Sequence, residues 1–204
     1  AYSKDELFKG GLKVYTTLDV SMQEAAEAAA RKKEQAAGDN YEVAMVAIDP
    51  DNGYIRALVG GKDYDASQVN MATGTGGSGR QAGSSFKTFT LVAAIEQGID
   101  PQTMIDASAT ASLPGWEVAN INHTNYGTKS IADSFAVSSN TAFARLILSI
   151  GPDKVVDVAK RMGITSPLTA TGSLTLGSES VTPLEMANAY ATIANGGTHY
   201  DPEC

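Results

Sequence analysis

The sequence reads GRQAGSSFKTFTLVAAIEQG from residue 79 to residue 98. After Ser84 the residues are mostly apolar until Gly98, so the stretch predicts a central, buried helix that ends at that glycine. Ser84 and Lys87 are three positions apart and would lie on the same face of this helix. A lysine is an awkward residue there, because burial disfavours its charge. The stretch therefore raises the question of what a serine and a lysine do side by side at the start of an apolar helix.

The Ser84–Lys87 pair has a chemical interpretation. Ser84 is expected at the helix N-terminus, where free backbone N–H groups and the positive end of the helix dipole favour developing negative charge. Lys87 lies between Phe86 and Phe89, and partial burial beside that positive end favours its neutral form. A neutral amine that touches a hydroxyl is a general base beside a nucleophile. A Ser-x-x-Lys match also arises about once by chance in a chain of this length, and serine is a common structural N-cap.

A second polar element, Ser138-Ser139-Asn140, interrupts the apolar segment 130–151. The segment predicts a short helix, a break at the two serines, and a second helix. Inside a helix these residues would compete with the backbone for hydrogen bonds, which favours a position at the break. A plain polar turn would have the same composition. The two elements together, each in the setting that its chemistry would need, are harder to attribute to chance than either alone.

The segments that precede the central helix predict strands and one helix. Residues 12–19, LKVYTTLD, contain β-branched and aromatic residues in alternation and predict a strand. Residues 21–38 predict a helix with a capping box of Ser21 and Glu24. Residues 42–61 contain two strand-like runs around DPDNG and predict a β-hairpin.

The segments that follow are predicted to be helical. Residues 152–163 begin with a proline at the first helical position and end with a glycine. Residues 182–197 begin with Thr182, Pro183 and Glu185 in a capping-box pattern and end with two glycines. The sum is a mostly helical α+β domain with its strands at the front. Because a hairpin plus one strand is a thin sheet, the sequence predicts an antiparallel sheet that is partly missing.

Composition and charge restrict the function. A chain of 204 residues with 43% hydrophobic and 19% charged residues is typical of one compact globular domain. The net charge is −8 and the 15 basic residues are scattered, which argues against nucleic acid and favours a peptide or small-molecule partner. The longest apolar runs are far shorter than the roughly 20 residues of a membrane span. Residues 1–10 lack a signal-peptide pattern, so any anchor is expected outside this chain.

Other candidate sites have little support. The single cysteine, Cys204, excludes a disulfide or a thiolate cluster within the chain. His123 and His199 lack a metal-binding spacing, so no metal site is expected. The long glycine-rich segment 62–83 has phosphate-loop spacing in part, but Arg80 follows where a lysine is required. We therefore expect no nucleotide or other cofactor, and we interpret this loop as a mobile lip of a cleft.

The sequence resembles a known family over nearly its whole length. Ser-x-x-Lys followed by Ser-x-Asn is the signature of penicillin-binding proteins and serine β-lactamases. Five segments are similar, in the same order, to parts of the transpeptidase domain of bifunctional (class A) penicillin-binding proteins: GGLKVYTTLD, AIDPDNGYIRALVGG, RQAGSSFKTFT, AVSSNTAFARL and LTLGSESVTPLEMANAYATIANGG. The resemblance implies the α+β fold of this family. It also implies that residues 21–204 form the N-terminal and central part of that domain, and that residues 1–20 enter as a strand or linker from an upstream domain.

The resemblance implies a role for each of four residues. Ser84 would be the acylated nucleophile and Lys87 the base that takes its proton. Ser138 would relay a proton toward the leaving amine. Asn140 would hydrogen-bond the amide carbonyl of the substrate and help to hold Lys87. One donor to the developing oxyanion would be the backbone N–H of Ser84.

The implied reaction is D,D-transpeptidation. Ser84 would attack the penultimate D-alanine carbonyl of a peptidoglycan stem peptide that ends in D-Ala-D-Ala, and a side-chain amine of a neighbouring stem would resolve the acyl-enzyme. β-Lactams, which resemble D-Ala-D-Ala, would acylate the same serine. The resemblance also implies a bacterial parent protein that is anchored in the cell membrane, acts on its extracytoplasmic face, and carries a glycosyltransferase domain upstream.

The sequence departs from the family at two places. The third family motif, Lys-Thr-Gly or Lys-Ser-Gly, does not occur, so we expect a domain truncated before that motif. Thr88 stands where the family usually has proline, and we expect little effect, because both residues suit the first turn of a helix. Two alternatives remain. One is a D,D-carboxypeptidase or β-lactamase, although no Glu-x-x-Leu-Asn pattern offers an activated water. The other is an inactive module that binds stem peptides or β-lactams.

Overall fold

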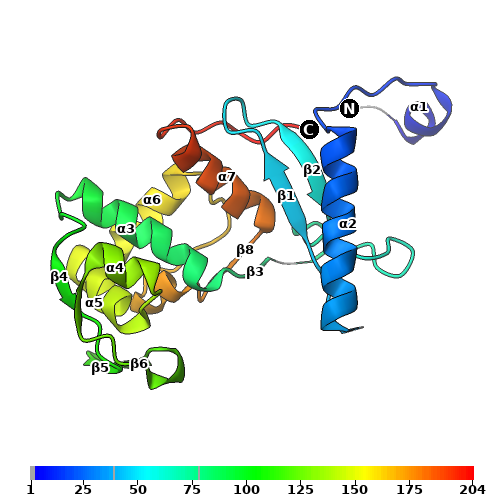
Figure 1. Ribbon diagram of the computed structural model, residues 1–204. Helices are drawn as coiled ribbons and strands as arrows, with labels where there is room; N and C mark the ends of the chain where they lie inside the picture. The colour runs from blue at the N-terminus through cyan, green and yellow to red at the C-terminus, as the bar shows by residue number, and fades with distance from the viewer. Residues whose placement is uncertain (1–2, 39, 78) are drawn as a thin grey trace.

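The computed structural model describes residues 3–38, 40–77 and 79–204, and Figure 1 shows their arrangement. The α-helices are α1 (Lys4–Lys9), α2 (Val20–Ala37), α3 (Lys87–Glu96), α4 (Ile131–Ala136), α5 (Asn140–Ile150), α6 (Pro152–Arg161) and α7 (Pro183–Ala194). Three 3₁₀ turns are η1 (Gly83–Phe86), η2 (Ile121–His123) and η3 (Gly172–Leu176). The strands are β1 (Met45–Ile48), β2 (Ile55–Val59), β3 (Arg80–Gln81), β4 (Met104–Asp106), β5 (Thr110–Leu113), β6 (Trp116–Ala119), β7 (Thr128–Ser130) and β8 (Ser180–Val181).

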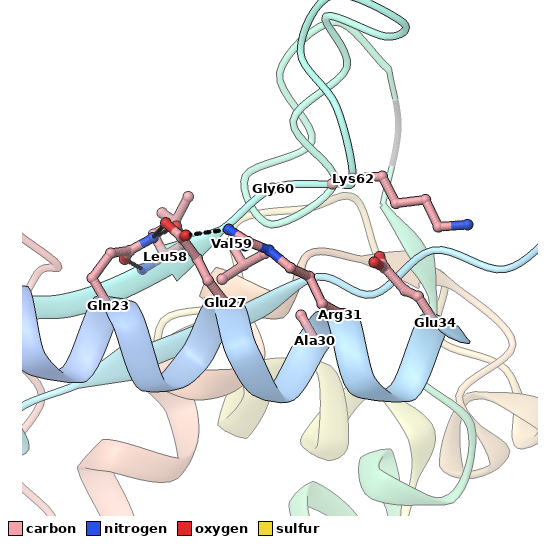
Figure 2. A pocket seen from close by; sticks show the side chains of 10 residues that line it. Gln23, Glu27, Ala30, Arg31, Glu34, Leu58, Val59, Gly60 and Lys62 are labelled. Atoms are coloured by element: carbon pink, nitrogen blue, oxygen red, sulfur yellow. Dashed lines mark hydrogen bonds and ion pairs between the residues drawn. The ribbon is translucent and has the colours of Figure 1, made fainter. Parts of the chain in front are cut away.

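A hairpin flanked by two helices forms one side of the molecule. β1 and β2 pair antiparallel, with Met45 opposite Val59, as the alternating sequence predicts. Helix α2 packs against β2 and helix α7 against β1 (Figure 1). Gln23 joins α2 to β2, because its side-chain amide donates to the carbonyl of Leu58 and accepts from the Leu58 N–H, at 3.0 and 2.8 Å (Figure 2). Gln23 thereby satisfies a backbone edge that would otherwise need a strand partner.

The other side of the molecule is a helical core around α3. Its buried residues include Phe86 at the end of η1, Phe89 in the first turn of α3, and Phe143 and Ile147 from α5. Helix α3 packs on both α5 and α6. The ring centroids of Phe86 and Phe89 are 4.6 Å apart, so the first turn of α3 is anchored in this core. The predicted buried central helix is therefore confirmed.

Short contacts between distant segments fix the start of α3. Strand β3 pairs with β8, which places Gln81 opposite Ser180 just before Ser84. Gly177 has a φ of +69° and a ψ of +40°, and a Cβ atom there would collide with the backbone of Gly83. A glycine is therefore required at this position on two grounds, the left-handed backbone and the close approach.

The structure contradicts two predictions for the N-terminal segments. Residues 12–19 form no strand, and all of them except the half-buried Thr17 are exposed. They contact β2 through Thr17 Oγ1, which donates to the Ile55 carbonyl, and through the Asp19 N–H, which donates to the Arg56 carbonyl. The residue types of this segment favour a strand, but the segment lacks the series of backbone hydrogen bonds to a neighbouring strand that defines one. Helix α2 is capped by Asp19, whose carboxylate accepts from the Met22 N–H, and not by Ser21.

Four strands between residues 104 and 130 were not predicted from the sequence. β4 pairs with β7, and β5 pairs with β6 in a hairpin that turns at Pro114 and Gly115. These strands are only three or four residues long, too short for an alternating pattern to be distinguished from loop sequence. They matter for function, because the end of β6 lies against the start of α5.

Candidate active site

The structure brings the four predicted site residues together around one amine. Lys87 Nζ lies 3.1 Å from Ser84 Oγ, 3.0 Å from Ser138 Oγ, 2.7 Å from the Ser138 carbonyl oxygen and 2.8 Å from Asn140 Oδ1. Two of these oxygens, the carbonyl and the amide oxygen, can only accept hydrogen bonds. A neutral amine would therefore give its two hydrogens to them and leave its lone pair for the two serine hydroxyls. This is the geometry that a general base needs.

The environment of Lys87 favours the neutral amine. Only 1% of the residue is exposed. Burial penalises the charged form and lowers the pKa of Lys87 from 10.5 to about 8. No carboxylate contact to Nζ occurs among the described residues to oppose this shift. About a tenth of the molecules would hold a neutral Lys87 at pH 7, which is sufficient for a base.

Ser84 is exposed while its partner is buried. The predicted α-helical start is corrected in detail: Ser84 lies in the 3₁₀ turn η1, and α3 begins at Lys87. A 3₁₀ helix has three residues per turn, so residues three apart lie directly above one another, and the Ser84–Lys87 contact is kept. The hydroxyl is accessible from outside, and the first turn offers backbone N–H groups that lack partners within the helix. An exposed hydroxyl thus lies beside an amine hidden from water, an arrangement that would suit a nucleophile and its base.

Ser138 and Asn140 lie at the predicted break between α4 and α5. Ser138 has a φ of +55°, a left-handed conformation that costs a non-glycine residue energy. This conformation turns both its carbonyl and its hydroxyl toward Lys87. Ser139 caps α5 by accepting from the Ala142 N–H. Asn140 Nδ2 donates to the Ala119 carbonyl at 3.0 Å, which fixes the amide so that its oxygen faces Lys87.

Three residues near the site were not predicted from the sequence. Asn120, next to Ala119, is 4% exposed and hydrogen-bonded to both neighbours of Asn140 in α5. Tyr190 of α7 donates to the carbonyl of Ser85, and its hydroxyl lies 2.7 Å from Thr88 Oγ1. Asn120 follows the short strand β6 and Tyr190 lies within α7, and neither position carried a signal in the sequence. Thr88, expected to matter little, makes a side-chain bond that proline lacks.

Among the described residues, neither histidine is hydrogen-bonded to this cluster. His123 is exposed, and His199 contacts Thr192. Within residues 3–38, 40–77 and 79–204, no three His, Cys, Asp or Glu side chains are grouped so that they could hold a metal ion. In the same residues, no helix has the length and apolar character to cross a membrane. The glycine-rich loop lines a cavity of about 510 Å³ together with Ser180 and Thr182, and β3 leads from it to Ser84.

A separate pocket beside α2 contains none of the four site residues. Figure 2 shows that the residues lining it come from α2, from the end of β2 and from the segment that follows β2. It has a volume of about 270 Å³ and mixes the charges of Glu27, Arg31, Glu34 and Lys62. Arg31 pairs with Glu27 at 2.7 Å, and the buried Glu34 accepts from the Val43 N–H. The Glu34 bond joins the end of α2 to the segment that leads into the hairpin, whereas the Arg31–Glu27 pair lies within α2.

Comparisons with known proteins agree with the geometry. A family model described as "Penicillin binding protein transpeptidase domain" matches residues 43–204. Penicillin-binding protein 2D of Bacillus subtilis is 35% identical over 206 residues, which cover 98% of this chain but 29% of that protein. The chain therefore spans less than a third of the length of this curated relative.

Solved structures extend the likeness to the fold. The structure of penicillin-binding protein PonA1 from Mycobacterium tuberculosis superposes with a TM-score of 0.87 at 35% identity, over 99% of this chain and 55% of that chain. PonA1 in complex with penicillin V gives a TM-score of 0.86 at 33% identity, over 99% and 56%. The family match covers well over half of the residues, so the α+β fold inferred from the sequence is confirmed and the chain belongs to the penicillin-binding protein transpeptidase family.

Proposed function

We propose that this chain is the acylating part of a D,D-transpeptidase domain, which cross-links peptidoglycan stem peptides and is inactivated by β-lactams. The observation that carries the proposal is the buried Lys87 amine, with a pKa of about 8, in contact with the exposed Ser84 hydroxyl. Two relatives in structure support it, since one was solved with penicillin V and another as a penicillin G acyl-enzyme. The proposal assigns a role to each of the four clustered residues.

In the first half-reaction, Ser84 Oγ bonds to the penultimate D-alanine carbonyl carbon and its proton passes to Lys87 Nζ. The tetrahedral intermediate then collapses, and the C–N bond to the terminal D-alanine breaks. The leaving amine receives a proton from Ser138 Oγ, which is replaced by the proton held on Lys87, 3.0 Å away. Asn140 Nδ2 gives one hydrogen to Ala119 and has a second for the amide carbonyl of the substrate.

In the second half-reaction, an amine of a neighbouring stem attacks the ester carbon and displaces Ser84. The amine loses a proton, which returns through Lys87 to the serine oxygen. A β-lactam follows the first half-reaction only, because its ring-opened amine stays attached to the acyl group. The two half-reactions together exchange one amide bond for another, so no cofactor is consumed.

A hydrolase would need a base for a deacylating water. Glu185 is a buried carboxylate next to the glycine-rich loop, and burial alone would raise its pKa. Bonds from Thr182, Thr165 and Ser166 outweigh burial and hold the pKa of Glu185 at about 2. A carboxylate with so low a pKa is a weak base at neutral pH, and the hydrogen bonds of Glu185 go to residues outside the cluster, so Glu185 does not offer the base that a hydrolase would need.

The remaining parts of the proposal concern the whole protein. By similarity to class A penicillin-binding proteins, residues 1–20 connect to an upstream glycosyltransferase domain and residues 21–204 belong to the transpeptidase domain. The parent protein would be anchored in the bacterial membrane with this domain on the extracytoplasmic face, where peptidoglycan stems are located.

The test uses a synthetic peptide that ends in D-Ala-D-Ala and an excess of a D-amino acid as acceptor. Mass spectrometry should detect a peptide in which the acceptor has replaced the terminal D-alanine. Ser84→Ala should abolish this product, whereas Ser85→Ala should retain it, because the neighbouring Ser85 hydroxyl donates to the Ala82 carbonyl away from Lys87. If the only product is a peptide that has lost its terminal D-alanine, the chain is a hydrolase. If no product forms, the chain is an inactive binding module. Either result would overturn the transpeptidase proposal.

A further inference from the structure

One buried side chain outside the proposed machinery connects the segments that build it. Asn120 follows β6, is 4% exposed, and lies 20 residues before Asn140 in sequence. Its Nδ2 contacts the carbonyl oxygens of Ala107, Ser108 and Thr124 at 3.1, 3.1 and 2.9 Å. Through Nδ2, Asn120 therefore connects the end of β6 to the two residues after β4 and to the turn that follows Asn120 itself.

The oxygen of the same amide points to the start of α5. Asn120 Oδ1 accepts from Ser139 Oγ at 3.0 Å and from the Thr141 N–H at 3.1 Å. These are the two residues that flank Asn140. The preceding residue, Ala119, accepts from the Asn140 side chain itself. Residues 119 and 120 thus hold Asn140 by its side chain and by both of its neighbours.

This attachment determines which atoms face Lys87. With Asn140 Nδ2 bound to Ala119, its Oδ1 accepts from Lys87 Nζ. Ser139 held by Asn120 also keeps Ser138 in its left-handed conformation, with its carbonyl 2.7 Å from Nζ. These two acceptors occupy two hydrogens of the amine and direct its lone pair toward the hydroxyls. A loss of either would let the amine rotate away from Ser84.

We propose that Asn120 is a positioning residue, which orients the Lys87 amine toward Ser84 by clamping residues 138–141 to the end of β6. The proposal rests on the proposed function for its consequence in catalysis, but the clamp itself is a property of the folded chain. Asn120 is not among the hydrogen-bond partners of Lys87 Nζ, so its effect is transmitted through Ser138 and Asn140.

The experiment compares Asn120→Ala with the unmodified chain in two measurements. The first is an NMR titration of chain labelled with ¹³C at the lysine Cε, in which the Lys87 signal is identified by its absence from Lys87→Arg. The second is the rate constant of acylation by a fluorescent penicillin. Asn120→Ala should move the Lys87 titration midpoint by at least about half a unit and lower the acylation rate at least about ten-fold.

Glu185→Gln is the matched control, because it breaks another buried network without contact to the cluster. It should lower the melting temperature yet leave the Lys87 midpoint and the acylation rate of the folded chain within about two-fold of their original values. If Asn120→Ala does not fold, Thr141→Val replaces it, since valine keeps the shape but removes a hydroxyl that lies 3.3 Å from Asn120 Oδ1 and donates to the Ser108 carbonyl. Thr141→Val should change both readouts in the same direction by a smaller amount.

Two results overturn the proposal. One is a folded Asn120→Ala chain with an unchanged Lys87 midpoint and an unchanged acylation rate, which would make Asn120 a structural residue only. The other is an equal change in the Glu185→Gln control, which would show that any loss of stability disturbs Lys87. If the unmodified chain is not acylated, the proposed function fails, and the Lys87 titration alone decides whether the clamp exists.

Discussion

Acylation of Ser84 should depend on pH through one group, the Lys87 amine. Its pKa is lowered from 10.5 to about 8 by burial. The difference corresponds to about 3 kcal/mol by which the folded site disfavours the ammonium relative to water. Because only the neutral amine can accept the Ser84 proton, the acylation rate should follow the neutral fraction. That fraction is about a tenth at pH 7 and rises about ten-fold per pH unit below the midpoint.

The assay measures the second-order rate constant for a fluorescent penicillin between about pH 5.5 and pH 9.5. We expect a slope of one at low pH, a midpoint near 8 and a plateau above it. Lys87→Arg provides the control, since a guanidinium stays charged over this range and should lower the plateau by at least about a hundred-fold. A rate that is constant over the whole range, or one that still rises with a midpoint near 10.5, would refute the assignment of Lys87 as a buried base.

The other predictions concern the contacts around the cluster. Gly177→Ala should destabilise the fold by at least about 1 kcal/mol in thermal unfolding, because the left-handed backbone and the approach to Gly83 leave no room for a Cβ; an unchanged melting temperature would contradict this. The pKa of Glu185 is about 2 in the folded chain and 4.5 in the reference state, so its ionised form should contribute about 3 kcal/mol to the free energy of unfolding above pH 4.5. This contribution should be lost as the pH falls toward 2, and urea unfolding of Glu185→Gln should lack this pH dependence. The Tyr190 hydroxyl connects Thr88 to the Ser85 carbonyl, and Tyr190→Phe and Thr88→Val both break this connection. Each variant should slow acylation a few-fold and the double variant should slow it no further, whereas additive losses would show independent roles.

The local half of the site could be predicted from the sequence. Ser84 and Lys87 are three residues apart, so any helical turn brings them together, and the structure kept this contact even though the turn is 3₁₀ and not α. Lys87 is buried whereas Ser84 is exposed, and the apolar residues that surround Lys87 in the sequence account for its burial. The predicted starts of α6, at a proline, and of α7, at a capping box, were correct for the same reason: they depend on neighbours in the chain. The capping box predicted at Ser21 was wrong, because Asp19 caps α2.

The long-range half could not be predicted from spacing. Ser138 and Asn140 meet Lys87 across more than 50 residues, and the resemblance, not the pattern, joined them. Asn120 was overlooked because an asparagine after a short strand has the composition of an ordinary turn. Its role depends on which carbonyls the fold brings within reach, and this information lies in tertiary packing. The strand wrongly predicted at residues 12–19 shows the converse, that propensity without a partner edge does not make a strand.

The central claim is that Ser84 becomes acylated because Lys87 accepts its proton. The most direct test is intact-mass spectrometry of the chain after incubation with benzylpenicillin, followed by peptide mapping of the adduct. We predict one penicilloyl group per chain on Ser84, present in Ser85→Ala and absent in both Ser84→Ala and Lys87→Arg. An adduct that persists in Ser84→Ala, or no adduct on the unmodified chain, would contradict the account.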